Sequence, residues 1–242
     1  MKYVRIRNPK TGRATRGKLE DGVVHTRQED FDPGKVGLLS PVKPGKIICV
    51  GLNYEDHVEE TSSELPEKPS LFFKPPSAVV GPGDPIVISE ENRFDPEAEV
   101  AIVIGKRCRN AEVDEAMRYV RGFTGLNDVT NRDAQEWEGN WVRAKGFDTA
   151  APVGPAVVPT EEIELPISFR LEVNGQLRQT GSTAELLFGI PELISEISSF
   201  MTLEKGDIIS TGTPRGIAPI HPGDLVSLEI DGIGVLENPV VS

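Results

Sequence analysis

The chain has 242 residues, of which 38% are hydrophobic, and it carries a formal net charge of -12. The hydrophobic content is enough for a sizeable core, so the composition excludes a disordered protein. The acidic excess argues against binding to nucleic acid or to anionic membranes, which both need clustered lysine and arginine. No stretch is long and apolar enough to cross a membrane, and no signal peptide opens the chain. We therefore predict a cytoplasmic protein without nucleic-acid or membrane partners, whose Cys49 and Cys108 are reduced thiols.

The first part of the chain alternates between short strand-like runs and turns. Strands are expected at Lys2 to Arg7, Thr15 to Glu20 and Val23 to Thr26, with Asp21-Gly22 as a hairpin turn. A stretch rich in Pro and Gly then follows at 41–45. The pattern predicts a small N-terminal β meander over residues 1–44, followed by a main domain over residues 45–242.

The main domain opens with a short buried strand, Ile47 to Val50, and then a helix that Asn53 is expected to cap. His57 and Glu60 lie three residues apart, so on a helix they share one face, which suits a histidine base oriented by a carboxylate. A surface ion pair is the alternative interpretation. The polar, aperiodic stretch 59–68 that follows is typical of a mobile loop or lid.

The remainder of the chain is dominated by short strands. They are expected at Leu71 to Phe73, Ala78 to Val80, Ile86 to Ile88 and Val100 to Ile104, and again beyond Phe200. One helix is predicted to start at the capping box Ser182 to Glu185 and to run through apolar positions as far as Ile197, broken or kinked at Pro191. With 24 Gly and 20 Pro, the fold class is mainly β (α+β).

Two carboxylates, Glu97 and Glu99, open the apolar run Val100 to Ile104. In an extended strand alternate side chains share a face, so these two anions would lie side by side and repel each other unless a cation is near. Asp128 follows another apolar stretch and supplies a third carboxylate. Three oxygen donors without a nearby Cys or His pair suit Mg²⁺ or Mn²⁺ rather than zinc, although a solvent-facing strand end also explains a lone Glu-x-Glu.

Six ordered motifs from Ile47 to the C-terminus together resemble the fumarylacetoacetate hydrolase family. They are Gly51-Leu52-Asn53-Tyr54 with His57 and Glu60, Phe72-Phe73-Lys74-Pro75, Glu97-x-Glu99, Asn127-Asp128-Val129-Thr130, Arg143-Ala144-Lys145-Gly146-Phe147-Asp148 and Thr211-Gly212-Thr213-Pro214. One departure is Asn131, where many members have Ala, and it leaves the proposed ligands untouched.

The resemblance implies a fold and a cofactor. The fold would be a mixed β-sandwich roll of the family's C-terminal type, usually in a homodimer. The cofactor would be Mg²⁺ or Mn²⁺, with Ca²⁺ as a substitute in crystals, held by Glu97, Glu99 and Asp128. Members act on small 2-oxo acids through an enolate that the cation stabilises.

The resemblance also implies roles for other residues. Lys145 would add a fixed positive charge, and His57 with Glu60 would form the base. Gln135, Arg132 and Thr213 would bind substrate oxygens. Further side chains have open interpretations: Arg215 selects a second carboxylate or faces solvent, and Trp137 and Trp141 line a pocket or pack in the core.

The motifs define enolate chemistry but leave the reaction open. The complete His57 and Glu60 pair would activate a water molecule for attack, so the leading prediction is a Mg²⁺-dependent acylpyruvate hydrolase that breaks a C–C bond. Isomerisation or tautomerisation of a hydroxydienedioate is the next alternative, which Gly51-Leu52-Asn53-Tyr54 suits at least as well, and oxaloacetate decarboxylation follows. A metal-dependent binding module for acidic metabolites is the non-enzymatic alternative.

Overall fold

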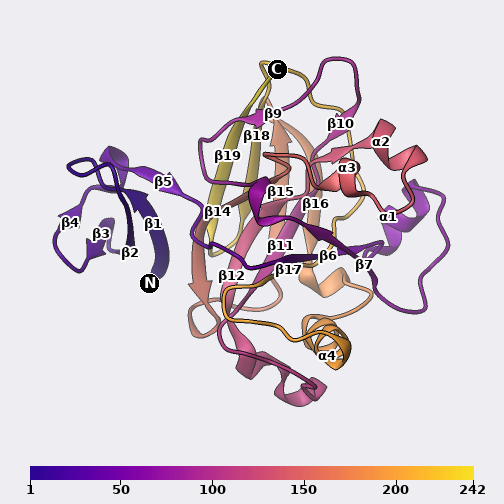
Figure 1. Cartoon of the computed structure of the whole chain (residues 1–242), viewed down its shortest axis with the longest axis horizontal. Helices are drawn as coiled ribbons and strands as arrows, with labels where there is room; N and C mark the ends of the chain where they lie inside the picture. Colours follow the sequence, from indigo (N-terminus) through magenta and orange to yellow (C-terminus); the bar gives the residue numbers. More distant parts are fainter.

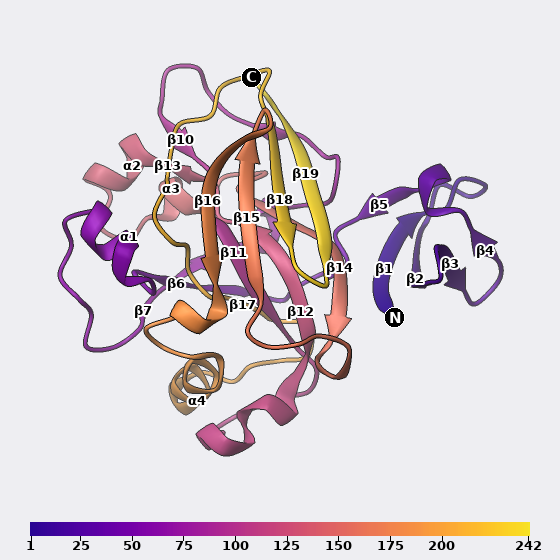
Figure 2. The ribbon, with the colours of Figure 1, turned by 180° about the vertical axis from the view of Figure 1, so that it is seen from behind.

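Two β-sheets packed face to face form the main body of the protein, which the computed structural model describes over residues 1–242 (Figure 1). The larger sheet has twelve strands, with the order β4-β3-β2-β1-β14-β12-β11-β17-β6-β7 and with β5 and β8 attached to β1 and β14. The smaller sheet has the order β16-β15-β18-β19-β9 and lies in front of the larger one in Figure 2. A separate ribbon pairs β10 with β13. The prediction of a mainly β protein is confirmed.

The larger sheet consists of β1 (Lys2–Arg7), β2 (Ala14–Glu20), β3 (Val23–Thr26), β4 (Asp30–Phe31), β5 (Gly37–Leu39), β6 (Ile47–Gly51), β7 (Ser70–Lys74), β8 (Val79–Val80), β11 (Ala98–Ile104), β12 (Val120–Asn127), β14 (Ala151–Pro159) and β17 (Ile208–Ser210). The remaining strands are β9 (Ile86–Val87), β10 (Phe94–Asp95), β13 (Thr130–Asn131), β15 (Ser168–Val173), β16 (Gln176–Ser182), β18 (Leu225–Ile230) and β19 (Gly234–Val241). The helices are α1 (Glu55–Glu60), α2 (Arg132–Trp137), α3 (Val142–Lys145) and α4 (Ile190–Phe200), with 3-10 turns η1 (Pro33–Lys35), η2 (Pro76–Ala78), η3 (Val113–Tyr119), η4 (Thr160–Glu162) and η5 (Thr183–Glu185).

Strand β11 lies at the centre of the larger sheet and is buried on both faces. Its even-numbered residues, from Ala98 to Ile104, belong to the main core, which also includes residues of β15, β18 and α4. Ala101 and Val103 point to the opposite face, into a second cluster. Glu97 and Glu99 continue this second row, as the alternation predicts.

The N-terminal meander, β1 to β5, lies to one side of the main body in both views (Figures 1 and 2). It joins the larger sheet through β1, where Tyr3 pairs with Val157 of β14. Its own small core contains Val4, Ile6, Val24 and Phe31 together with Ala156 of β14. The predicted strands and the Asp21-Gly22 turn are present, whereas the division into domains at 1–44 and 45–242 stays a prediction.

Two details of the predicted helices are wrong. Asn53 does not cap α1, since the N-cap residue is Tyr54, and the Asn53 amide instead bonds the carbonyl oxygens of Phe188 and Thr211. The Ser182 capping box closes only the short η5, and α4 begins at Ile190 with Pro191 in its first turn. Proline is favoured there because its missing N–H would have no intrahelical partner.

The three shortest α-helices gather at one end of the molecule, where β11 begins and β12 ends (Figure 1). α2 and α3 pack against each other, and α3 also contacts β7. The helices α1, α2 and α3 therefore enclose the strand ends that carry the predicted carboxylates. No helix of the protein is long and apolar enough to span a membrane.

Candidate active site

Glu97, Glu99 and Asp128 come together because β11 and β12 are antiparallel neighbours, with Ala98 opposite Asn127. The Asp128 N–H donates to the Glu97 carbonyl at 2.8 Å, and the Glu97 N–H donates to Asn127 Oδ1 at 3.0 Å. All three carboxylates are buried, and one oxygen of each lies within 4.8 Å of the others. The structure thus assembles the predicted triad.

Two cations, the buried Lys145 and the largely buried Arg132, neutralise one side of the triad. Lys145 Nζ donates to Glu97 Oε2 at 2.7 Å and to Asp128 Oδ2 at 2.9 Å, while Arg132 donates to Glu97 Oε1 at 2.5 Å and to Asp95 Oδ2 at 2.8 Å. Burial by itself would raise the pKa of Glu97, but Lys145 and Arg132 outweigh it and hold that pKa well below its ordinary value. Burial would likewise lower the pKa of Lys145, yet Asp128 and Glu97 raise it, so this ammonium stays charged.

Glu99 has no cationic partner. Its Oε2 accepts hydrogen bonds from Ser210 Oγ at 2.5 Å and from the Gly212 N–H at 2.9 Å. Burial and the neighbouring charge of Asp128 raise the pKa of Glu99 to about 8, more than these two donors lower it. At neutral pH this carboxyl therefore retains a proton unless a cation displaces it.

The triad fits a hard divalent cation on the evidence of two of its members. Asp128 Oδ1 is buried and accepts no hydrogen bond, although the ammonium of Lys74 lies 2.7 Å away. Glu99 carries the raised pKa of an anion without a counterion. A carboxylate oxygen that accepts no hydrogen bond and a carboxyl without a cationic partner are what Mg²⁺ or Mn²⁺ would use among oxygen donors.

Lys74 is a residue of the site for which no role was predicted from the sequence. Its side chain is fully buried, and Nζ donates to the carbonyls of Lys145 at 2.7 Å, Ala150 at 2.8 Å and Val129 at 3.2 Å. One ammonium thus ties the end of β7 to the segments that carry Asp128 and Lys145. The available signal was a lysine at the end of an apolar strand, since a charge in such a position needs buried partners.

His57 and Glu60 form the pair that their spacing predicts. Nδ1 of His57 lies 3.3 Å from Glu60 Oε2, and Glu60 Oε1 accepts the N–H of Gly216 at 3.0 Å, which fixes the carboxylate to the loop after β17. Only 8% of the His57 side chain is exposed, which disfavours the alternative of a surface ion pair.

These side chains share one cavity of about 270 Å³. Eight of the nine predicted site residues line it, namely His57, Glu97, Glu99, Asp128, Arg132, Gln135, Lys145 and Thr213. Glu60 is not among the lining residues and supports His57 from behind, whereas Arg215 is exposed and outside the cavity. Thr61 and Ser63, at the start of the predicted lid, line the cavity too, but closure of 59–68 stays a prediction.

An apolar wall completes the cavity. Trp141 and Phe72 meet edge to face, with ring centroids 5.4 Å apart, and Lys145 Nζ lies 4.9 Å from the Phe72 centroid. Leu52 and Trp141 both have left-handed backbone angles, with φ of 56° and 57°, a costly conformation that tends to persist at functional sites. Trp141 thus lines the pocket, whereas Trp137 is 65% exposed and lies against Arg143.

Gln179 is a second residue that the sequence did not reveal. Its Nε2 donates to Thr213 Oγ1 at 2.9 Å, and its Oε1 accepts the Ala98 N–H at 2.9 Å. Gln179 therefore holds Thr213 beside the start of β11. It lies on β16, far from both partners in sequence, and no local motif marks it.

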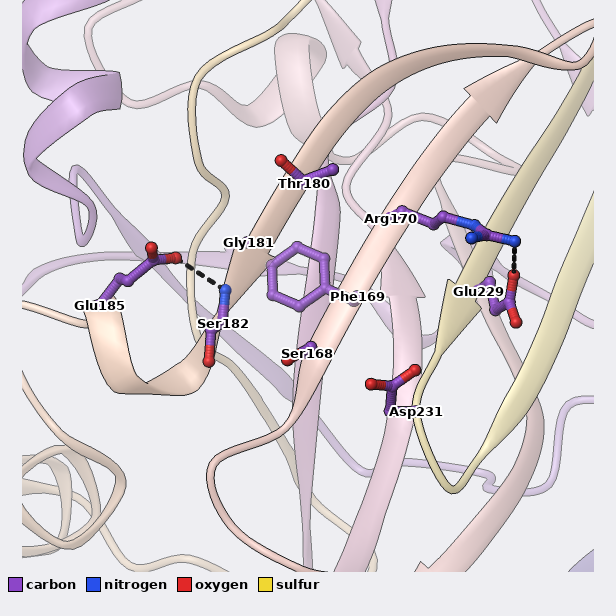
Figure 3. A pocket seen from close by; sticks show the side chains of 9 residues that line it. All are labelled: Ser168, Phe169, Arg170, Thr180, Gly181, Ser182, Glu185, Glu229 and Asp231. Atoms are coloured by element: carbon purple, nitrogen blue, oxygen red, sulfur yellow. Dashed lines mark hydrogen bonds and ion pairs between the residues drawn. The ribbon is translucent and has the colours of Figure 1, made fainter.

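A different hollow, of about 400 Å³, lies on β15, β16 and β18 (Figure 3). Arg170 points toward Glu229 and pairs with it at 2.6 Å, and Glu185 accepts the Ser182 N–H. Its charged groups are thus partly paired with one another, and its carboxylates do not form a metal-ligating cluster. The cavity around Asp128 is therefore the candidate active site, because it contains the carboxylate cluster.

Comparison with known proteins identifies the family of the chain. Residues 46–241 match the family Fumarylacetoacetate (FAA) hydrolase C-terminal. The chain is 42% identical over 225 residues to oxaloacetate tautomerase YisK of Bacillus subtilis, covering 87% of this chain and 75% of that protein.

Two solved structures are similar over the whole chain. The 5-carboxymethyl-2-hydroxymuconate delta-isomerase of Mycobacterium smegmatis has a TM-score of 0.91 and 40% identity, covering 100% of this chain and 98% of that one. The maleylpyruvate hydrolase of Sphingobium sp. SYK-6, solved with manganese(II) and pyruvate, has a TM-score of 0.86 and 28% identity, with coverage of 100% and 99%. The match over 46–241 and the identity over most of the chain show that this protein is a member of the fumarylacetoacetate hydrolase family.

Proposed function

We propose that the protein is a divalent-metal-dependent enzyme that moves a proton at the carbon next to the 2-oxo group of a small 2-oxo acid, and that keto–enol tautomerisation of oxaloacetate is its reaction. The observation that carries the proposal is the His57–Glu60 pair, which adjoins the same cavity as the carboxylate triad and Lys145. The oxaloacetate tautomerase among the relatives supports the choice of substrate.

His57 is the group that transfers the proton. With its Nδ1 hydrogen donated to Glu60, the Nε2 lone pair is free to accept a proton from the substrate carbon. The electron pair of the broken C–H bond then moves into the enolate, and return of the proton to oxygen gives the enol. Glu60 stabilises the imidazolium in between, held by the Gly216 N–H.

Fixed charges in the cavity bind the anionic substrate and oppose the charge that develops on it. Lys145 is buried and carries a raised pKa, so it stays an ammonium throughout. Arg132, Gln135 and Thr213 present polar atoms to the same space. In a site shielded from water, such prearranged groups stabilise developing charge more strongly than solvent does.

Glu97, Glu99 and Asp128 would hold the cation. Bound there, Mg²⁺ or Mn²⁺ would supply a positive charge that stabilises an enolate oxygen. Of the two, Mg²⁺ is the proposed native ion.

Hydrolysis of an acylpyruvate is the second candidate. The His57–Glu60 pair that accepts a proton from carbon could equally accept one from a water molecule, whose oxygen then attacks the distal carbonyl. The maleylpyruvate hydrolase among the similar structures favours this alternative.

The test follows the ultraviolet absorbance of oxaloacetate enol and of acetylpyruvate, each with Mg²⁺ and with a chelator. We expect metal-dependent interconversion of oxaloacetate tautomers, reduced by about 10²–10⁴-fold in kcat in His57→Ala, the range that general bases contribute. His25→Ala is the matched control, since His25 lies on the meander beside Asp30 and 45% of its side chain is exposed. Mg²⁺ affinity should be nearly unchanged in both variants.

The outcomes separate the candidates. Metal-dependent loss of acetylpyruvate with release of pyruvate, and no effect on oxaloacetate, would replace tautomerisation by hydrolysis. Full activity of His57→Ala would refute the role of the imidazole. Tight Mg²⁺ and oxalate binding without turnover of any 2-oxo acid would instead support a binding module.

A further inference from the structure

Another large hollow lies between the N-terminal meander and the rest of the larger sheet, away from the carboxylate triad. Its volume is about 510 Å³, nearly twice that of the catalytic cavity. Five of its twelve lining residues are basic and none is acidic, in a chain with 38 acidic and 26 basic residues. The basic residues are Arg5, Arg16, Lys43, Arg121 and Lys205.

The positive charges of this hollow are not neutralised by the protein. The two carboxylates of the adjoining loop are already engaged, Glu204 with Arg107 and Asp207 with Lys46. None of the five basic residues is within ion-pair distance of a carboxylate, and the Arg5 guanidinium instead donates to the carbonyl of Ser40 at 2.6 Å.

The meander even places two of these charges against each other. Arg5 of β1 pairs directly with Arg16 of β2 in the antiparallel register, an arrangement of like charges that destabilises a sheet. Burial and then the charge of Arg16 lower the pKa of Arg5. The fold therefore maintains an unfavourable contact that a bound anion would relieve.

The opposite wall of the hollow also carries basic side chains without carboxylate partners, those of Arg121 and Lys205. Arg121 lies over the ring of Tyr3, with Cζ 4.5 Å from the centroid, so its planar face is stacked while its N–H edge remains free to donate. Gly105 permits this position, because a Cβ there would lie 3.2 Å from the Arg121 backbone. Lys205 and Gly206 complete this wall.

We propose that this hollow binds a small polyanion, a molecule with at least two phosphate or carboxylate groups, and that the ligand joins the meander to the catalytic sheet. Guanidinium groups bind both kinds of anion through paired hydrogen bonds. The volume lies within the range of small-molecule sites, which starts at about 300 Å³. Gly105 and Arg121 lie at the far ends of β11 and β12 from Glu99 and Asp128, so the two sites are distinct.

The experiment uses the full chain and measures binding of tripolyphosphate and of citrate by calorimetry at constant, low ionic strength, with acetate as the monovalent comparison. The test variants are Arg16→Gln and Lys205→Gln, one from each wall and both exposed. Arg13→Gln is the matched control, an exposed arginine of the meander that does not line the hollow. None of these residues belongs to the catalytic cavity.

We expect saturable binding of one polyanion per chain, weakened about tenfold in each test variant and unchanged in Arg13→Gln, as befits the loss of one charged hydrogen-bond donor. Preference for tripolyphosphate or for citrate distinguishes a phosphorylated ligand from a polycarboxylate. The melting temperature without ligand should not fall in Arg16→Gln, since that change removes a repulsion. A purely structural role would lower it.

Three results would overturn the proposal. The first is absence of binding, and the second is equal weakening in Arg16→Gln and Arg13→Gln, which would indicate a diffuse charge effect. The third is a dimer that Arg16→Gln dissociates while neither anion binds, which would assign the hollow to an acidic segment of a second copy. Because the readout is binding, failure of the proposed tautomerase activity does not affect it.

Discussion

Replacement of Lys74 by Met tests how the site is held together. Methionine has a similar volume and fits an apolar environment, but it leaves Asp128 without its 2.7 Å ion-pair partner and the carbonyls of Lys145 and Ala150 without the Lys74 donor. Removing one partner of a buried ion pair typically costs about 3–5 kcal/mol. Asp128 keeps Lys145 at 2.9 Å, but Lys74→Met removes the second positive charge beside Asp128 and the donor of three buried carbonyls together. Both side chains of this pair are fully buried, so solvent does not screen the loss.

The assay is equilibrium urea unfolding in a chelator, so that a bound cation does not stabilise the folded state. We expect a loss of about 3–5 kcal/mol, or a melting temperature lower by roughly 6–20 °C for a chain of this size. Lys35→Met is the control. Its partner Asp32 lies 3.5 Å away and 82% of the lysine side chain is exposed, so the change should stay within about 0.5 kcal/mol.

A double-mutant cycle sharpens the test. If the cost of Lys74→Met arises from the lost attraction between Lys74 and Asp128, adding Asp128→Asn should recover part of the lost stability. Additive losses in the double variant, or a loss below about 1 kcal/mol in Lys74→Met alone, would refute the reasoning that this pair stabilises the site.

Three further predictions concern the cavity. The pKa of Glu99 is raised from 4.5 to about 8, so the folded protein holds a proton that the unfolded chain loses, and the stability of the metal-free protein should fall as pH rises from about 4.5 towards 8. Over the same range the Mg²⁺ affinity measured by calorimetry should rise, and it should level off above about pH 8. A flat affinity profile would contradict this prediction. Gly212→Ala should lower the stability measured by thermal unfolding by about 1–3 kcal/mol, since φ of Gly212 is 96° and the new Cβ would lie 2.9 Å from Asn53 Cβ. An unchanged melting temperature would show that alanine fits at this position without strain. Trp141→Ala should raise KM roughly tenfold in steady-state kinetics, because it removes the apolar wall beside Phe72. A fall in kcat at constant KM would instead indicate that Trp141 contributes to the chemical step.

Much of the candidate site could be predicted from local patterns. Strand alternation placed Glu97 and Glu99 on one face, and helical spacing brought His57 to Glu60, because both periods are properties of the backbone. The predictions that Asn53 caps α1 and that a helix starts at Ser182 were wrong. Asn53 found partners in Phe188 and Thr211, more than a hundred residues away, which a local motif cannot reveal.

The sequence by itself determined the mainly β class, and it predicted the carboxylate cluster and the pairing of His57 with Glu60, since these depend on residue types and short spacings. Only the tertiary structure decided that Lys74 joins Lys145 as a buried counterion of Asp128 and that Glu99 has no cationic partner. It also decided that Arg5, Arg16 and Lys205 surround one hollow. Charge balance in a folded protein depends on distances between segments far apart in the chain, and the packing of the two sheets sets those distances.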